Sequence, residues 1–137
     1  MSLISYMEMS SFKIFMVDVG LLAAKVLLEG NQIFEEFKGA LTEQFVAQEL
    51  SAYGLSLYYY SITNSKWKID FVIQKEQYCI PIEVKAEENL RAKSLKVFCE
   101  KYHPEIALRT SMSDYRKEDT FINVPLYSLS QYISNIQ

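Results

Sequence analysis

Residues 67–85 read WKIDFVIQKEQYCIPIEVK, and apolar residues alternate with other residues in both halves of this stretch. Successive side chains of a strand point to opposite faces, so the pattern predicts one strand over 67–74 and a second over 78–85. The polar pair Glu76 and Gln77 between them indicates a hairpin. The tip contains no Gly or Asn, so a loop longer than two residues is also compatible with the sequence. A longer loop with the same centre would keep the same pairing.

This pairing places Asp70 opposite Glu83, and the period of two places Lys85 on the same face as Glu83. Opposed side chains in such a pair have Cβ atoms ~4.5–5.5 Å apart. Two carboxylates that close repel each other unless a proton or a cation lies between them, and a hard divalent cation prefers oxygen ligands. The trio therefore indicates metal-dependent phosphoryl chemistry, in which the lysine orients water or neutralises developing charge. The alternative is an ordinary charge cluster on a solvated sheet face.

Helices are predicted before the hairpin. Gly20 to Glu29 has the composition of a helix that ends at Gly30. Apolar residues then recur at helical spacing from Ile33 to about Tyr53, with Gly39 as a break and Gly54 as the stop. Residues 12–19, FKIFMVDV, fit either a strand or the lead-in to a helix.

An aromatic-rich strand is predicted over 57–62, immediately before the hairpin. After the hairpin we expect a helix over 91–102, strands over 105–110 and 121–127 around a polar loop, and a short helix from Ser128. This order predicts an α/β domain with a central mixed β-sheet flanked by helices.

Composition limits the classes of function. The chain has 137 residues, of which 50% are hydrophobic, and this suits one globular domain. A formal net charge of -3 provides no overall positive field for nucleic acid or an anionic membrane. Nucleic-acid binding would therefore depend on a local patch, for which Arg91, Lys93 and Lys96 are the candidates. A solvated helix face is the alternative for these three residues.

Other classes of protein are disfavoured by what the sequence contains. Two cysteines and one histidine make neither a disulfide framework nor a zinc site, which indicates a reducing environment. The sequence has no GxxxxGK[ST] loop for ATP hydrolysis. It also has no signal-peptide pattern and no apolar run near the ~20 residues of a membrane helix. We expect a cytoplasmic protein with no membrane partner.

A helix glutamate, an aspartate on one strand and (D/E)xK on the next resemble the PD-(D/E)xK nuclease superfamily, which has the restriction-endonuclease-like fold. More narrowly, FKIFMVDVGLL, KGALTEQFVAQEL, WKIDFVI and PIEVKAEENLRAKSLKVF resemble a domain of unknown function. That domain lies at the C-terminus of bacterial and archaeal predicted AAA-type ATPases. The resemblance covers nearly the whole chain. It implies an attached P-loop ATPase domain and a winged-helix segment, with ATP bound only through that upstream domain.

The resemblance also implies site residues. Glu43, Asp70, Glu83 and Lys85 would be catalytic, and Mg²⁺ or Mn²⁺ would be held by Asp70, Glu83 and the Val84 backbone carbonyl, with Glu43 as a further ligand. At helical spacing Glu43 shares a face with apolar residues, so it can point toward the sheet. Its alternative is a first-turn acid favoured by the helix dipole. The proline that often precedes the aspartate is absent, because Ile69 stands there.

We expect a single nuclease-like domain over residues 1–137 that is the C-terminal fragment of a longer ATPase. Residues 1–3 are interpreted as an expression-derived start, 12–30 as a lead-in segment and helix, and 31–137 as the nuclease-like core. The expected function is Mg²⁺-dependent phosphodiester hydrolysis on DNA or RNA under control of the ATPase.

Two other functions stay open. One is a catalytically inactive module that binds nucleic acid or protein and regulates the ATPase. The other is a dimerisation domain, for which an aromatic strand edge at Tyr58–Tyr60 would serve, so a homo-oligomer is compatible with the sequence.

Overall fold

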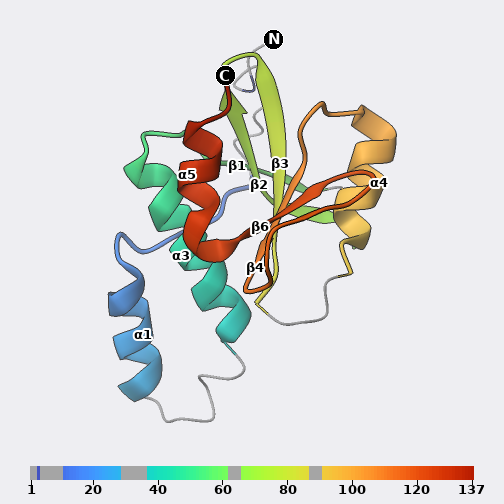
Figure 1. Cartoon of the computed structure of the whole chain (residues 1–137). Helices are drawn as coiled ribbons and strands as arrows, with labels where there is room; N and C mark the ends of the chain where they lie inside the picture. Colours follow the sequence, from blue (N-terminus) through green and yellow to red (C-terminus); the bar gives the residue numbers. More distant parts are fainter. Residues whose placement is uncertain (1–2, 4–10, 29–36, 62–65, 87–90) are drawn as a thin grey trace.

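A mixed sheet of six strands in the order β1-β2-β3-β4-β6-β5 forms the middle layer of the protein (Figure 1). The structure is a computed structural model that describes residue 3 and residues 11–28, 37–61, 66–86 and 91–137. The strands are β1 (Tyr58–Ser61), β2 (Lys68–Lys75), β3 (Tyr78–Val84), β4 (Leu108–Ser111), β5 (Arg116–Lys117) and β6 (Ile122–Pro125). The helices are α1 (Val19–Leu28), α3 (Lys38–Ala52), α4 (Lys93–Tyr102), the 3₁₀ turn η2 (Leu126–Ser128) and α5 (Leu129–Ser134). The predicted α/β class with a central mixed sheet flanked by helices is confirmed.

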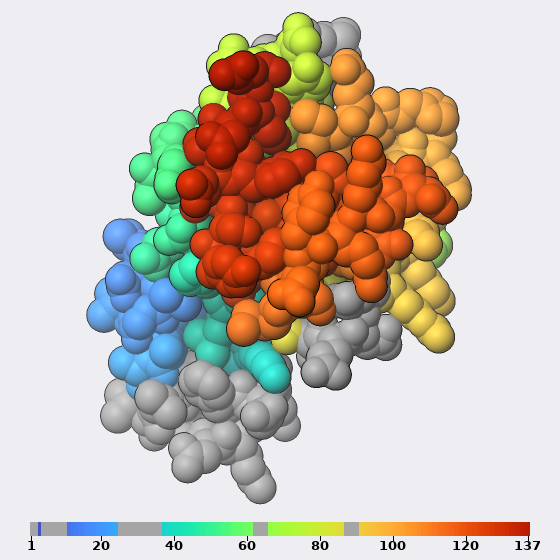
Figure 2. Space-filling view, viewed as in Figure 1, coloured from blue at the N-terminus to red at the C-terminus, as the bar shows by residue number. Residues whose placement is uncertain are grey.

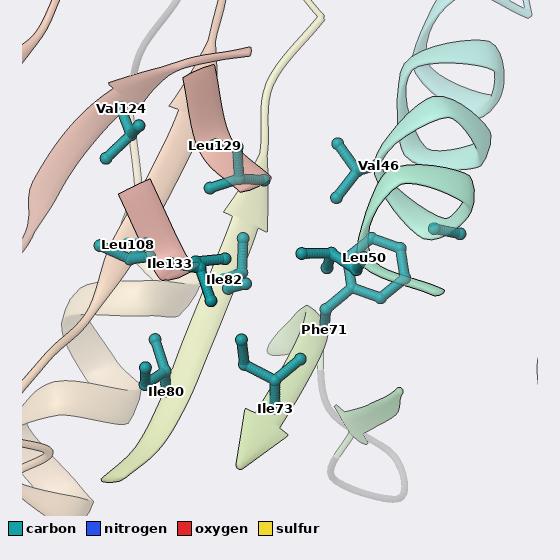
Figure 3. Packing of buried hydrophobic residues seen from close by; sticks show 11 residues of the cluster. Val46, Leu50, Phe71, Ile73, Ile80, Ile82, Leu108, Val124, Leu129 and Ile133 are labelled. Carbon is teal, nitrogen blue, oxygen red and sulfur yellow. The ribbon is translucent and has the colours of Figure 1, made fainter. Parts of the chain in front are cut away.

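The helices cover both faces of the sheet. On one face α3 and α5 pack against β2, β3, β4 and β6 (Figure 1). The buried side chains between them are Val46, Ala47, Leu50, Phe71, Ile73, Ile80, Ile82, Leu108, Val124, Leu129 and Ile133 (Figure 3). On the other face α4 covers a second cluster of Ile69, Val72, Ala92, Leu95, Phe98, Cys99, Ala107 and Phe121. The sheet therefore separates two hydrophobic cores.

The predicted hairpin is present. Strands β2 and β3 are antiparallel, with pairs running from Phe71–Ile82 to Lys75–Tyr78. The loop consists of Glu76 and Gln77, and Glu76 has a positive φ of 52°. β3, β4 and β6 are parallel, and α4 makes the crossover from β3 to β4 that a parallel pair requires.

One irregularity breaks the predicted alternation in β2. Tyr58 pairs with Val72 and Tyr60 pairs with Ile69, so two residues of β2, Asp70 and Phe71, lie opposite Tyr59. This extra residue is a β-bulge, which reorients the side chains beside it. As a result Ile69 packs in the α4 cluster and Phe71 in the α3 cluster. Regular alternation over 67–74 would place both residues on one apolar face of the strand, and this expectation is wrong.

The N-terminal elements agree in part with the predictions. Residues 12–18 form neither a strand nor a helix, and α1 begins after Asp18, whose Oδ1 accepts a hydrogen bond from the N–H of Leu21. The start predicted at Ile33 for the long helix falls outside the described residues, and Gly39 lies inside α3 without breaking it. Figure 2 shows α1, in blue, lying against α3.

The remaining differences lie at element ends and in one loop. The stop at Gly54 is confirmed, because this residue has a φ of 74° that a side chain would disfavour. The polar loop predicted between 110 and 121 contains a short strand, β5, which pairs antiparallel with β6. The expectation of an irregular loop is wrong there, since only two residues of β5 pair and no sequence pattern marks them.

Candidate functional site

Asp70 lies in the bulge of β2, one residue before Phe71, which pairs with Ile82 at the end of the hairpin away from its loop. Its Oδ2 accepts a hydrogen bond from the backbone N–H of Val84 at 2.8 Å. Burial raises the pKa of the Asp70 carboxyl to about 6; the hydrogen bond from Val84 lowers this pKa, and the nearby charges of Glu43 and Glu83 raise it. Asp70 thus has the environment of a carboxylate that is costly to ionise.

Glu83 is buried on β3, with 5% of its surface exposed. Its Oε1 lies 2.7 Å from Nζ of Lys85, as period two predicts for residues on one strand face. Its Oε2 accepts a hydrogen bond of 3.3 Å from the N–H of Leu95 in the first turn of α4. Ala92 at the N-cap of α4 has no side-chain oxygen, so Glu83 performs this capping from a neighbouring strand.

The two carboxylates do not face each other as the hairpin alone predicts. Glu83 turns toward α4, whereas the carboxylate of Asp70 turns to the N–H of Val84. The bulge explains the difference, because it changes the direction of Asp70 relative to a regular strand. The charges of Glu43 and Glu83 still reach Asp70, so these three acids share one region at the end of the hairpin.

Glu43 lies in the first half of α3 and forms an ion pair with Lys13, at 2.5 Å between Oε1 and Nζ. The same Nζ lies 3.3 Å from the backbone oxygen of Asp70 and near the rings of Tyr59 and Phe71, at 5.3 and 5.7 Å from their centroids. Glu43 therefore points toward the sheet, as predicted, and is paired with a lysine from 30 residues earlier in the sequence.

The carboxylate oxygens of this region are ligands that a hard cation prefers, but two of the three acids already have a lysine partner. Among the described residues, no group of three or more His, Cys, Asp or Glu side chains is placed to hold a metal ion. Glu43 pairs with Lys13, and Glu83 pairs with Lys85. One buried polar atom is left over: the hydroxyl of Thr110, beside Val84 in the β3–β4 register, has no hydrogen-bond partner in the described part of the chain. The negative charges of Glu43 and Glu83 raise the pKa of Asp70, and a bound cation would relieve this repulsion.

The predicted basic patch lies at the beginning of α4. Arg91, Lys93 and Lys96 are exposed, and the first turn of this helix is the one that contacts Glu83. These cations are therefore close in the fold to the acidic residues and accessible to solvent. Their binding to nucleic acid stays a prediction.

A family comparison adds to this geometry. The family described as a domain of unknown function (DUF4143) matches residues 38–129, which is more than half of the chain. The chain belongs to the DUF4143 family. The match includes Glu43, Asp70, Glu83 and Lys85 but not Lys13. No curated protein matches this DUF4143 chain, and no solved structure matches it. None of the helices in the described residues is long and apolar enough to cross a membrane.

Two residues of the DUF4143 site region were missed by sequence reasoning. Lys13 is one, and its signal is a single charge within the apolar run FKIFMV. Arg109 on β4 is the other; it stands beside Glu83 in the β3–β4 register and is 2% exposed. Its Nε donates to Oδ1 of Asn123 at 2.8 Å, and its guanidinium lies 4.8 Å from the ring centroid of Phe121. A charged residue within the apolar stretch IALRTS is the signal that could have identified it.

Proposed function

We propose that this DUF4143 domain is a PD-(D/E)xK-type module that hydrolyses phosphodiesters with Mg²⁺ or Mn²⁺. The observation that supports this most is Asp70, a carboxyl whose pKa is raised to about 6 by burial, with Glu43 and Glu83 adding to the effect. Perturbed acids of this kind gather at functional sites, where the cost of ionisation is balanced by a ligand. The order α3, β1, β2, β3, α4, β4 also supports a restriction-endonuclease-like fold.

In this proposal each residue of the chain has a role. Asp70, Glu83 and the carbonyl of Val84 would hold the ion, with Glu43 as a further ligand. A bound Mg²⁺ supplies Lewis-acid polarisation of the scissile phosphate and a lower pKa for a bound water. Lys85, whose side chain is 29% exposed beside Glu83, orients the attacking water or neutralises charge on the phosphate. The N–H of Leu95 in the first turn of α4 donates to Glu83 and holds its carboxylate in place.

The test combines metal binding with cleavage. Mn²⁺ is titrated into the protein by calorimetry at millimolar concentrations, and labelled single- and double-stranded DNA and RNA are incubated with Mg²⁺ or Mn²⁺. We expect Asp70→Asn and Glu83→Gln to weaken metal binding, and Lys85→Met to keep it while cleavage falls by about 100-fold or more. Glu76→Gln serves as the matched acid control, because Glu76 lies at the hairpin tip, at the opposite end of the hairpin from Asp70. Cleavage by Lys85→Met at the rate of the unmodified protein would contradict the proposal.

A second function is favoured by the ion pairs. Glu43 and Glu83 each have a lysine partner, and Glu83 also caps α4, so the same residues could stabilise a catalytically inactive module. Such a module would bind nucleic acid or protein and regulate an attached AAA-type ATPase, as the resemblance implies. The titration separates the two functions: no Mn²⁺ binding by any variant favours the inactive module.

A further inference from the structure

We propose that Lys13 is a built-in competitor of the metal ion, so that a divalent cation binds tightly only after the segment of residues 11–18 moves away from α3 and β2. This inference rests on the proposed metal site at Asp70 and Glu83. It adds a regulatory contact that the matched family region, residues 38–129, does not contain.

The surroundings of the Lys13 ammonium are those of a bound cation. Its two oxygen contacts are the carboxylate of Glu43 and the backbone carbonyl of Asp70. Carboxylate and carbonyl oxygens are also the ligands that hard divalent ions prefer. The rings of Tyr59 and Phe71 add cation–π attraction on the same nitrogen. A divalent ion bound by Glu43 and Asp70 would lie close to the ammonium of Lys13, and like charges repel strongly at short range. The ion and the ammonium are therefore alternative occupants of the same place.

The segment that carries Lys13 is held in place by contacts that are independent of its charge. The side-chain amide of Gln44 accepts a hydrogen bond from the N–H of Met16 at 2.8 Å and donates one to its carbonyl at 2.6 Å. Oε1 of Gln48 accepts another from the N–H of Val19 at 2.7 Å. Phe15 packs on Phe71, with centroids 5.6 Å apart.

These contacts form a clamp on the backbone of the segment, and the clamp sets the position of Lys13. Gln44 is 3% exposed and satisfies both backbone groups of one residue, which is the pairing that a neighbouring strand would otherwise supply. Its loss would free the segment without changing any charge. Charge and position can therefore be tested separately.

The experiment is a calorimetric Mn²⁺ titration of three variants and the unmodified protein, each checked for folding by circular dichroism. Lys13→Met removes the ammonium and keeps an unbranched chain against the rings. Gln44→Met removes the clamp and keeps every charge. Lys75→Met is the matched control, because Lys75 pairs with Glu76 at the hairpin tip and its loss changes the net charge equally.

We expect Lys13→Met to bind Mn²⁺ about two- to fivefold more tightly than the unmodified protein, since a partly exposed ion pair contributes free energy of this order. Gln44→Met should shift affinity in the same direction, and Lys75→Met should leave it unchanged. Equal, measurable affinity in the unmodified protein and Lys13→Met overturns the competition and leaves the metal site intact. No binding by any of the four proteins overturns both the competition and the metal site.

Discussion

The carboxyl of Asp70 links folding to function at the scale of one residue. Its pKa lies above the ordinary aspartate value in the folded protein, mainly because of burial. The folded protein therefore binds this proton more tightly than the unfolded chain, and the stability that this provides is complete below pH ~4 and is lost by about pH 6. Near neutral pH the ionised carboxylate destabilises the fold.

Asp70→Asn should therefore stabilise the protein at about pH 8 and have little effect at about pH 4. The amide oxygen can still accept the hydrogen bond from Val84, so packing is kept. A pKa about two units above the unfolded value corresponds to at most roughly 3 kcal/mol. Urea unfolding at both pH values measures the difference, with Asp119→Asn as an exposed control. A less stable Asp70→Asn at the higher pH would mean that the ionised carboxylate stabilises the fold.

Whether a site residue can be predicted depends on how far it lies in the sequence from the other site residues. Glu83 and Lys85 share a strand, and Asp70 lies across a local hairpin, so the period of two and the loop position place all three near one another. Lys13 and Arg109 reach the same region through contacts of α3 and β4, which no local pattern encodes. Sequence reasoning therefore found the acids and missed two of the cations around them.

At the scale of elements, the hairpin also has one feature that a local pattern predicts and one that depends on another strand. The register of β2 and β3 is predictable, because a slip by one residue would move buried Ile80 and Ile82 to the wrong face. The bulge at Asp70 is set by pairing with β1, and no glycine marks it in the sequence. The fold class was therefore predictable, whereas the direction of the Asp70 side chain was not.

The hairpin tip provides a prediction at this scale. Glu76 is the first loop residue and has a φ of 52°, a region that costs energy for a residue with a Cβ. Glu76→Gly should stabilise the protein by about 0.5–1 kcal/mol, because glycine adopts this conformation without strain. Gln77→Gly is the matched control and should destabilise, since Gln77 has no positive φ and glycine adds entropy to the unfolded chain. Thermal unfolding of both variants checks this, and equal shifts in one direction would contradict it.

At the scale of the whole molecule, one sheet separates two cores. Leu50 of α3 and Leu95 of α4 are both completely buried, each in the cluster on its own face. Periodicity predicted that each helix has an apolar face, but not which face of the sheet it covers, because that choice depends on the crossover through α4. Glu83 connects the layers directly, since it belongs to β3 and caps α4.

This coupling predicts that both layers unfold together. The only tryptophan, Trp67, lies beside α4 and lines a small pocket with Val97 and Phe98. Leu50→Ala, on the opposite face, should cost about 2–5 kcal/mol and shift the tryptophan fluorescence transition as far as the circular dichroism transition. Leu95→Ala should do the same from the α4 side. If Leu50→Ala moves only the circular dichroism transition, the α4 layer unfolds independently, and Glu83 does not transmit stability between the layers.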